Sequence, residues 1–158
     1  MIFVTVGSQK FPFDRLVRKV DQMVREGLIH EEVFIQTGAS QYVPACPHQA
    51  FCGQGHFAEL MESCDILITH GGAGTMVNAV KLGKKAIAVP RLARYGEHVD
   101  DHQLELAVRL HEMALLCACP DVERLPEALE GLNGRRFERF HSNTEAFLTS
   151  LDGYIRSL

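Results

Sequence analysis

The sequence repeatedly sets a short apolar run, rich in β-branched residues, before a glycine turn and a segment with helical periodicity. Residues 65–69 show this most clearly, because Asp-Ile-Leu-Ile-Thr leads through His70 into a glycine-rich turn. Runs this short and apolar are typical of strands buried on both faces of a parallel sheet. The helical segments between them supply the crossovers that parallel strands require.

We therefore expect an α/β fold. Right-handed crossovers assemble such units into a Rossmann-like, doubly wound, mostly parallel sheet, here of about six strands. The expected strands are 2–6, 33–36, 49–52, 65–69, 86–89 and 114–118, and the expected helices are 13–24, 56–64, 72–82, 99–113, 122–132 and 144–155. The length of 158 residues suits a single domain spanning 1–158.

Charge and composition exclude several classes of protein. Sixteen Lys and Arg against twenty Asp and Glu leave a formal charge of −4, which argues against a nucleic-acid-binding module. No apolar run approaches the ~18 residues of a membrane span. The opening MIFVTVGSQK lacks the basic segment of a secretion signal. Five cysteines without regular spacing favour reduced thiols, and hence a cytoplasmic location.

The first candidate site is the loop that follows the expected strand at 65–69 and opens the next helix. Its glycines allow the backbone to approach a bulky anion, and the free amides and dipole of the helix start attract that anion. The residues expected to bind a diphosphate are Gly71, Gly72, Ala73, Gly74 and Thr75. The loop matches neither the dinucleotide fingerprint nor the P-loop. The alternative is a tight turn in which glycine serves packing alone.

A second glycine turn follows the expected strand at 2–6 and consists of Gly7, Ser8 and Gln9. Ser8 can donate to a phosphate, and Gln9 to a phosphate or a sugar hydroxyl. Both glycine loops would lie at the carboxyl edge of the sheet, where open parallel sheets bind ligands. The alternative is that Ser8 caps the following helix.

The third candidate is the segment 91–103, which crowds polar side chains at a helix start. Carboxylate and amide groups can together satisfy the lone pairs and protons of sugar hydroxyls, which makes this segment, with Asp100, Asp101, His102 and Gln103, a candidate sugar site. Acidic residues also stabilise a helix N-terminus through its dipole. That alternative explains Asp101 but neither His98 nor Gln103.

Cysteine and histidine recur at Cys46, His48, Cys52 and His56. Their spacing matches no common structural zinc motif, and a free cysteine is most often a small buried hydrophobe. We therefore expect no metal site. The chain also lacks the Gly-x-Ser-x-Gly elbow that would present a nucleophilic serine.

Together the segments 2–9, 69–75 and 96–104 resemble the C-terminal, nucleotide-sugar-binding domain of glycosyltransferase family 28. The resemblance covers nearly the whole chain and looks nearest to the PssE-type subunits of bacterial exopolysaccharide and capsule synthesis. The chain is also similar to the catalytic subunit of the eukaryotic dolichol-linked UDP-GlcNAc transferase. The stretch 96–104 is the most specific part of it.

The resemblance implies a role for each candidate residue. Gly7, Ser8 and Gln9 match the first glycine loop of the family, and residues 71–75 match its diphosphate loop. The segment 52–57 matches the region around the uracil, where Phe57 is a stacking candidate. Asp101 and Gln103 match the element that binds donor-sugar hydroxyls. Many members have a ribose-binding Glu where this chain has Asn78, which would bind ribose without a charge.

The function implied is that of the donor-binding half of an inverting, UDP-sugar-dependent glycosyltransferase of the GT-B architecture. The donor would be a UDP-hexose, with galactose or glucuronic acid as the sugar. Arg91 and Arg94 are candidates to pair with a glucuronate carboxylate, with solvated loop arginines as the alternative. Fixed amides would stabilise the leaving UDP without a metal or other cofactor. His70 and His98 are candidate catalytic residues, with structural histidines as the alternative.

The resemblance also implies a second, membrane-anchored subunit of the PssD type that binds a lipid-linked acceptor. This chain would then act at the cytoplasmic face of the plasma membrane and would self-associate when isolated. Two alternatives stay open: a non-catalytic nucleotide-binding module, and a stabilising subunit whose partner performs the chemistry.

Overall fold

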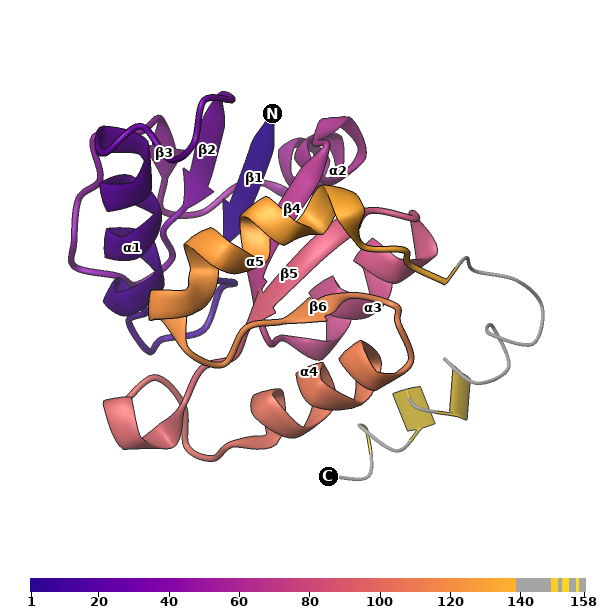
Figure 1. The fold of residues 1–158 in the computed structure, drawn as a ribbon. Coiled ribbons are helices and arrows are strands. Elements are labelled where there is room, and N and C mark those ends of the chain that lie inside the picture. Colours follow the sequence, from indigo (N-terminus) through magenta and orange to yellow (C-terminus); the bar gives the residue numbers. More distant parts are fainter. Residues whose placement is uncertain (139–148, 151, 154–155, 157–158) are drawn as a thin grey trace.

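The computed structural model describes residues 1–138, 149–150, 152–153 and 156. Its centre is a parallel sheet in the order β3-β2-β1-β4-β5-β6 (Figure 1). The strands are β1 (Ile2–Thr5), β2 (Val33–Gln36), β3 (His48–Gln49), β4 (Ile66–His70), β5 (Lys85–Val89) and β6 (Cys117–Ala118). This is the order of the doubly wound Rossmann fold, so the expected fold class is confirmed.

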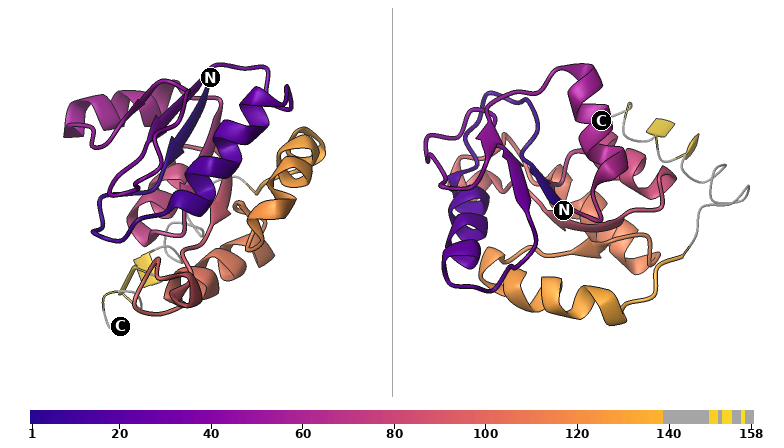
Figure 2. Two further views of the ribbon diagram at one scale, coloured as in Figure 1. Left: turned by 90° about the vertical axis from the view of Figure 1, so that its left-hand side faces the viewer. Right: turned by 90° about the horizontal axis from the view of Figure 1, so that it is seen from above.

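Helices cover both faces of the sheet (Figure 2). They are α1 (Asp14–Arg25), α2 (Gln54–Ser63), α3 (Ala73–Lys81), α4 (His102–Glu112) and α5 (Leu125–Gly131), with the 3-10 turns η1 (Ala93–Tyr95), η2 (Val122–Arg124) and η3 (Leu132–Gly134). Apolar side chains of α1 and α5 share one core cluster, whereas those of α2, α3 and α4 share the other. The sheet is therefore the middle of three layers.

The alternation within β1 shows how the sequence fills both cores. Ile2 and Val4 point into the cluster under α1 and α5, while Phe3 between them points into the cluster under α2, α3 and α4. Successive strand side chains point to opposite faces, so a strand buried on both faces is largely apolar. All four residues of β1 are buried, and Thr5, its one polar residue, donates a hydrogen bond to Gln36 Oε1.

Two of the differences between the expected and the observed elements have local reasons. The expected strand at 114–118 is reduced to Cys117–Ala118, because Ala114 adopts a left-handed conformation with φ 57° that ends the helix before it. The expected helix at 99–113 begins at His102, because Asp100 accepts a hydrogen bond from the backbone of His102 and holds the preceding segment in a loop. The strand expected at 49–52 is instead found at His48–Gln49, so it begins one residue earlier and ends three residues sooner than expected.

Most of the expected helix at 144–155 lies outside the described residues; 149–150 and 152–153, which are described, are helical. Within the described part of the chain, no helix is long and apolar enough to cross a membrane.

The topology brings three loops together at one edge of the sheet. Chain order reverses between β1 and β4, which pair in parallel with Thr5 opposite Thr69. The loops after β1, β4 and β5 therefore leave the sheet side by side at its carboxyl edge. In open α/β sheets this reversal creates the crevice in which ligands bind.

Candidate functional site

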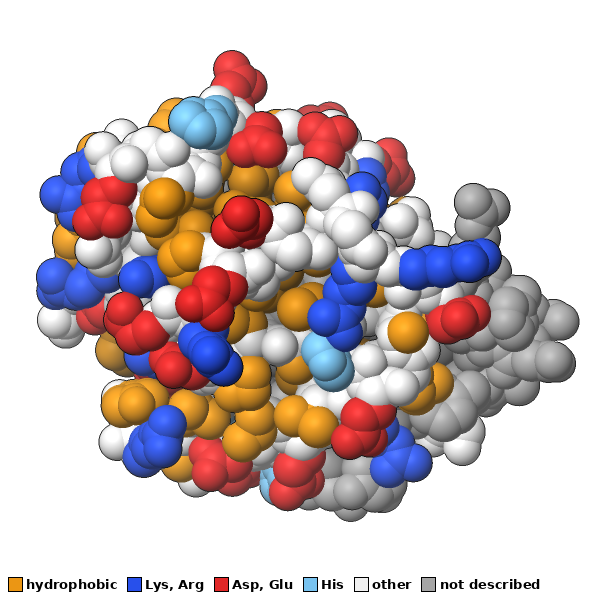
Figure 3. Space-filling model, in the orientation of Figure 1, with side chains coloured by type: hydrophobic (Ala, Val, Ile, Leu, Met, Phe, Trp, Pro, Cys, Tyr) orange, Lys and Arg blue, Asp and Glu red, His pale blue; other side chains and the backbone are white. Residues whose placement is uncertain are grey.

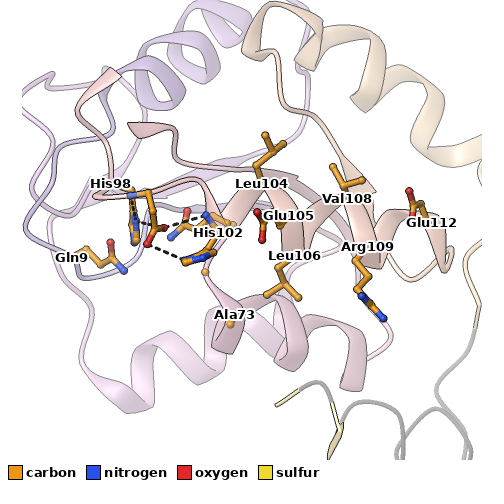
Figure 4. A pocket seen from close by; sticks show the side chains of 14 residues that line it. Gln9, Ala73, His98, His102, Leu104, Glu105, Leu106, Val108, Arg109 and Glu112 are labelled. Carbon is orange, nitrogen blue, oxygen red and sulfur yellow. Dashed lines mark hydrogen bonds and ion pairs between the residues drawn. The ribbon is translucent and has the colours of Figure 1, made fainter. Parts of the chain in front are cut away.

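A cavity of about 660 Å³ opens at this reversal point. It is bounded by Gln9 after β1, by the start of α3, and by the loop and helix that follow β5. In Figure 4, Gln9, His98 and His102 lie toward one end, and Arg109 and Glu112 lie at the other, along α4. Of the candidates from the sequence, the structure brings Gln9, Gly71, Gly72, Ala73, His98, Asp100, His102 and Gln103 to this cavity.

His70, the last residue of β4, lies beneath both glycine loops with only 5% of its surface exposed. A Cβ atom added to Gly7 would lie 2.5 Å from His70 Nε2, and one added to Gly72 would lie 2.1 Å from His70 Cε1. Gly7 also has φ +78°, which disfavours a side chain. Gly7 and Gly72 are thus needed for packing against this imidazole.

Gln103 connects His70 to the loop after β5. Its Oε1 accepts a hydrogen bond from the Arg91 backbone N–H at 3.1 Å, and its Nε2 lies 3.4 Å from His70 Nδ1. A Cβ atom on Gly71 would lie 2.7 Å from Gln103 Cβ, so Gly71 also serves packing. Both ends of the Gln103 amide are therefore engaged within the protein.

Arg91 anchors the site from below. Its fully buried guanidinium donates to the carbonyls of Val6 at 2.5 Å, Phe11 at 2.8 Å and Glu97 at 3.1 Å. These contacts join the loop after β1 to the loop after β5. Burial lowers the pKa of Arg91 to about 10. The expectation that Arg91 faces a glucuronate carboxylate is wrong, because its donors are turned inward onto backbone carbonyls.

Arg94, the other arginine of that expectation, is exposed, and its guanidinium lies 4.8 Å from the centre of the Tyr95 ring. The buried carboxylate of Glu97 accepts hydrogen bonds from Arg15 and from the Leu92 backbone, and so supports the same loop. The sequence marks this position only by a proline and an arginine directly after a buried strand, a pattern that does not show whether the arginine is buried.

His70 is a neutral residue at physiological pH. Burial, with a smaller contribution from the Arg91 charge, lowers the pKa of His70 to about 3. It therefore contributes no charge to the cavity and does not titrate near pH 7.

A more exposed group stands at the mouth of the cavity. The Asp100 carboxylate contacts Nδ1 of His98 at 3.1 Å and Nδ1 of His102 at 2.9 Å (Figure 4). The backbone hydrogen bond from His102 and the charges of both rings lower the pKa of Asp100, so it stays ionised. Of this group, His98 was a candidate from the sequence as a catalytic residue, whereas the sharing of the Asp100 carboxylate by both rings follows only from the fold.

The start of α3 carries open amides. Gly72 is the N-cap residue and no side chain caps the helix, so the first-turn N–H groups of this nine-residue helix are available to a ligand. Gly74 is exposed, and a Cβ atom there would contact nothing within 4 Å. This arrangement can hold an anion such as a phosphate.

Besides the two arginines, eight candidates are not among the residues that line the cavity. Gly7 and His70 lie beneath it, Gly74 and Thr75 lie in the first turn of α3, and the other four lie elsewhere. Phe57 packs edge-on against Phe3 in the core, with ring centres 5.6 Å apart, and Asn78 is exposed on α3. Asp101 accepts a hydrogen bond from the Ala93 backbone at 2.9 Å on the other side of the α4 start. Ser8 is exposed and caps no helix, since the N-cap of α1 is Phe13.

The cysteine and histidine group does not form a metal centre in the described residues. Cys46 is buried, with its thiol 3.5 Å from Asp21, and His48 Nδ1 lies 2.8 Å from the Cys46 carbonyl. That the chain needs no metal stays a prediction.

Comparison with curated proteins finds the UDP-N-acetylglucosamine transferase subunit ALG13 of Mus musculus and of Homo sapiens. Each is 28% identical, over 127 and 128 residues, which is 74% and 75% of this chain but 10% and 11% of those proteins. The chain thus spans about a tenth of the length of these relatives.

Among solved structures, the solution NMR structure of ALG13 superposes with a TM-score of 0.60 at 19% identity, covering 93% of this chain and 94% of that one. This likeness shows a shared fold. The family model of the glycosyltransferase family 28 C-terminal domain matches residues 1–153. The chain therefore belongs to the family of glycosyltransferase family 28 C-terminal domains.

Proposed function

We propose that the chain is the donor-binding and catalytic subunit of a two-subunit, inverting, UDP-sugar-dependent glycosyltransferase. The observation that carries this proposal is the cavity at the β1/β4 reversal, which joins the open N-terminus of α3 to the polar start of α4. The N-terminus of α3 suits a diphosphate, and the polar start of α4 suits a hydroxyl-rich sugar. Membership of a glycosyltransferase family supports the same reading.

The geometry favours a leaving group stabilised by fixed dipoles. Charge develops on the departing UDP as the bond to the anomeric carbon breaks. The first-turn amides of α3 can accept that charge without rearranging, so the proposed reaction requires no metal. His98, tied to Asp100 at the cavity mouth, is our candidate for a proton acceptor on this chain.

The sugar we propose is one of three. Galactose and glucuronic acid follow from the resemblance to PssE-type subunits, and N-acetylglucosamine is the sugar in the name of the curated relatives. The inward-facing Arg91 removes one reason to favour glucuronic acid.

We also propose a membrane-anchored, PssD-type partner that presents a lipid-linked acceptor at the cytoplasmic face of the membrane, in exopolysaccharide or capsule synthesis. The curated relatives are named as a subunit, which supports a partner in general. Hydrophobic side chains gather over η1 and the first part of α4 (Figure 3). Tyr95 is 53% exposed and Val99 is 73% exposed in this region, beside the cavity. A partner there would bring the acceptor to the donor, and self-association would cover the same residues in the isolated chain.

Calorimetry tests the donor site. UDP, UDP-N-acetylglucosamine, UDP-galactose and UDP-glucuronic acid are titrated into the chain, with FMN and NAD as competitors of another class. We expect UDP and at least one UDP-sugar to bind. Binding of FMN or NAD without UDP would favour the non-catalytic nucleotide module instead.

A transfer assay tests the division of labour. Membranes containing the partner are mixed with the chain, a labelled UDP-sugar and a lipid-linked acceptor, and each component is also assayed alone. We expect transfer only from the mixture, because positioning the acceptor supplies up to ~7–11 kcal/mol of such a barrier. Transfer by the partner without this chain would make the chain a stabilising subunit.

A further inference from the structure

We propose that Gln103 is a positioning residue that holds His70 in the tautomer protonated at Nε2, so that His70 donates a neutral, fixed hydrogen bond to the bound diphosphate. This proposal rests on the proposed function only in taking the bound anion to be the diphosphate of UDP. It gives Gln103 a role that acts through another side chain rather than on the sugar.

The orientation of the Gln103 amide is set by the backbone. The Arg91 N–H can only donate, and it lies 3.1 Å from one end of the amide, so that end must be the oxygen Oε1. The other end, the NH₂ group Nε2, is thereby directed at His70 Nδ1, at 3.4 Å. If the amide were flipped, its NH₂ group would face the Arg91 backbone N–H, and two hydrogen-bond donors would oppose each other.

The tautomer of His70 follows from this orientation. Because the Gln103 NH₂ group only donates, Nδ1 of His70 must accept and carries no proton. The low pKa of the buried ring keeps it neutral, so its single proton resides on Nε2. In a neutral histidine, a nitrogen that accepts a hydrogen bond leaves the other nitrogen as the donor.

The Nε2–H group is placed between the two glycine loops. A Cβ atom on Gly7 would lie 2.5 Å from Nε2, and one on Gly72 would lie 2.7 Å from it. Among the described residues Nε2 has no hydrogen-bond partner, and it is not one of the fully buried unpartnered atoms, which are Thr69 Oγ1 and Arg91 Nε. This N–H therefore keeps contact with solvent beside the N-terminus of α3.

A donor of this kind fits the leaving group. It lies beside the helix start that attracts an anion, and its strength does not vary with pH in the physiological range. It therefore adds to the fixed amides as the diphosphate gains charge. An unprotonated Nε2 would instead set a lone pair against the phosphate oxygens.

The test combines imidazole NMR with calorimetry. Long-range ¹H–¹⁵N spectra of the wild-type chain should show His70 protonated at Nε2 and unprotonated at Nδ1. The substitution Gln103→Glu keeps the size of the side chain and the acceptor for the Arg91 N–H, but presents an acceptor to His70. We expect the His70 proton to move to Nδ1 and the affinity for UDP to fall at least about tenfold.

A matched control separates added charge from the tautomer. Gln9→Glu sets the same charge in the same cavity without a hydrogen bond to His70, so the tautomer should remain that of the wild type. If Gln103→Glu does not fold, Gln103→Met gives the same test, with a mixture of tautomers and an affinity for UDP lowered about threefold.

Two further variants address His70 itself. His70→Gln offers an amide N–H near the position of Nε2 and should retain UDP affinity to within about threefold, whereas His70→Leu should lose at least about tenfold. Equal losses in the two variants would show a structural role.

The outcomes separate the two proposals. A wild-type His70 protonated at Nδ1, or unchanged UDP affinity when the proton has moved, overturns the positioning role of Gln103. A residue that bound only sugar hydroxyls would lower the affinity for a UDP-sugar and spare that for UDP. Failure of the wild-type chain to bind UDP would overturn the proposed function, while the tautomer in the free chain would still be measured.

Discussion

Gly72 and Gly74 lie two residues apart at the start of α3, yet their surroundings are opposite. A Cβ atom on Gly72 would lie 2.1 Å from the ring of His70, whereas one on Gly74 would meet nothing within 4 Å. Gly72 is required by the packing beneath the site, and Gly74 leaves the first-turn amides open above it. One glycine-rich loop thus meets a packing requirement at Gly72 and leaves space over the helix start at Gly74, while its binding of a diphosphate stays a prediction.

The largest effect should come from filling the space beside His70. Gly7→Ala should lower the free energy of unfolding by about 3 kcal/mol, because it combines steric overlap with a left-handed backbone. Gly72→Ala has the overlap alone and should cost about 2 kcal/mol. Urea unfolding measures both.

The control for these two substitutions is a His70→Ala background, which removes the ring that they overlap. There Gly72→Ala should cost markedly less than in the wild type. Equal costs in both backgrounds would show that His70 is not what constrains this glycine.

The second effect is a pH dependence of stability that His70 brings. The pKa of His70 is lowered from 6.5 to about 3 in the folded chain, so the unfolded chain binds the proton more tightly. Stability from this group is fully present above pH 6.5 and is lost as pH falls. We expect about 2 kcal/mol to be lost between pH 8 and pH 5.

Unfolding curves of the wild type and of His70→Gln across this range isolate that contribution. The two proteins should converge in stability toward pH 5. Parallel curves would mean that His70 titrates normally and is not buried in solution.

The third effect should spare the fold and alter binding. Gly74→Val places a branched side chain over the open amides of α3, where it should lower the affinity for UDP at least about tenfold. Stability should not fall, because glycine is the poorer helix former. Gly74→Ala is the matched control, since its single methyl group meets no neighbour. UDP affinity that is normal in a folded Gly74→Val variant would remove this loop from the site.

The sequence predicted the features that depend on local pattern. Apolar runs located β1, β2, β4 and β5, and the glycines after β1 and β4 located both glycine loops, because burial on two faces favours apolar side chains in these strands. The start of α4 was missed because side chains of the preceding loop bond to the backbone. Such a loop can carry apolar residues at helical spacing although its backbone is not helical.

Features that join distant segments were beyond the sequence. Arg91 binds the carbonyl of Val6, 85 residues away, and no local pattern distinguishes a buried arginine from an exposed one. The same holds for the contact between Gln103 and His70, 33 residues apart. The glycines indicated that another part of the chain packs closely against this loop, but they did not indicate that it is the side chain of His70.

The smallest effect concerns Asp101, which sequence reasoning paired with Gln103 and the structure separates from it. Residues two apart at a helix start project in different directions, so Gln103 turns into the site while Asp101 binds the Ala93 backbone at 2.9 Å. Asp101→Ala should therefore lower the free energy of unfolding by about 1 kcal/mol, through one lost hydrogen bond, and leave UDP affinity unchanged. Calorimetry with UDP and with each UDP-sugar distinguishes the two possible roles. A loss confined to the UDP-sugars would show that the loop before α4 turns Asp101 toward the sugar when the donor binds. Equal affinities in the variant and the wild type would leave the sugar to the residues that line the cavity.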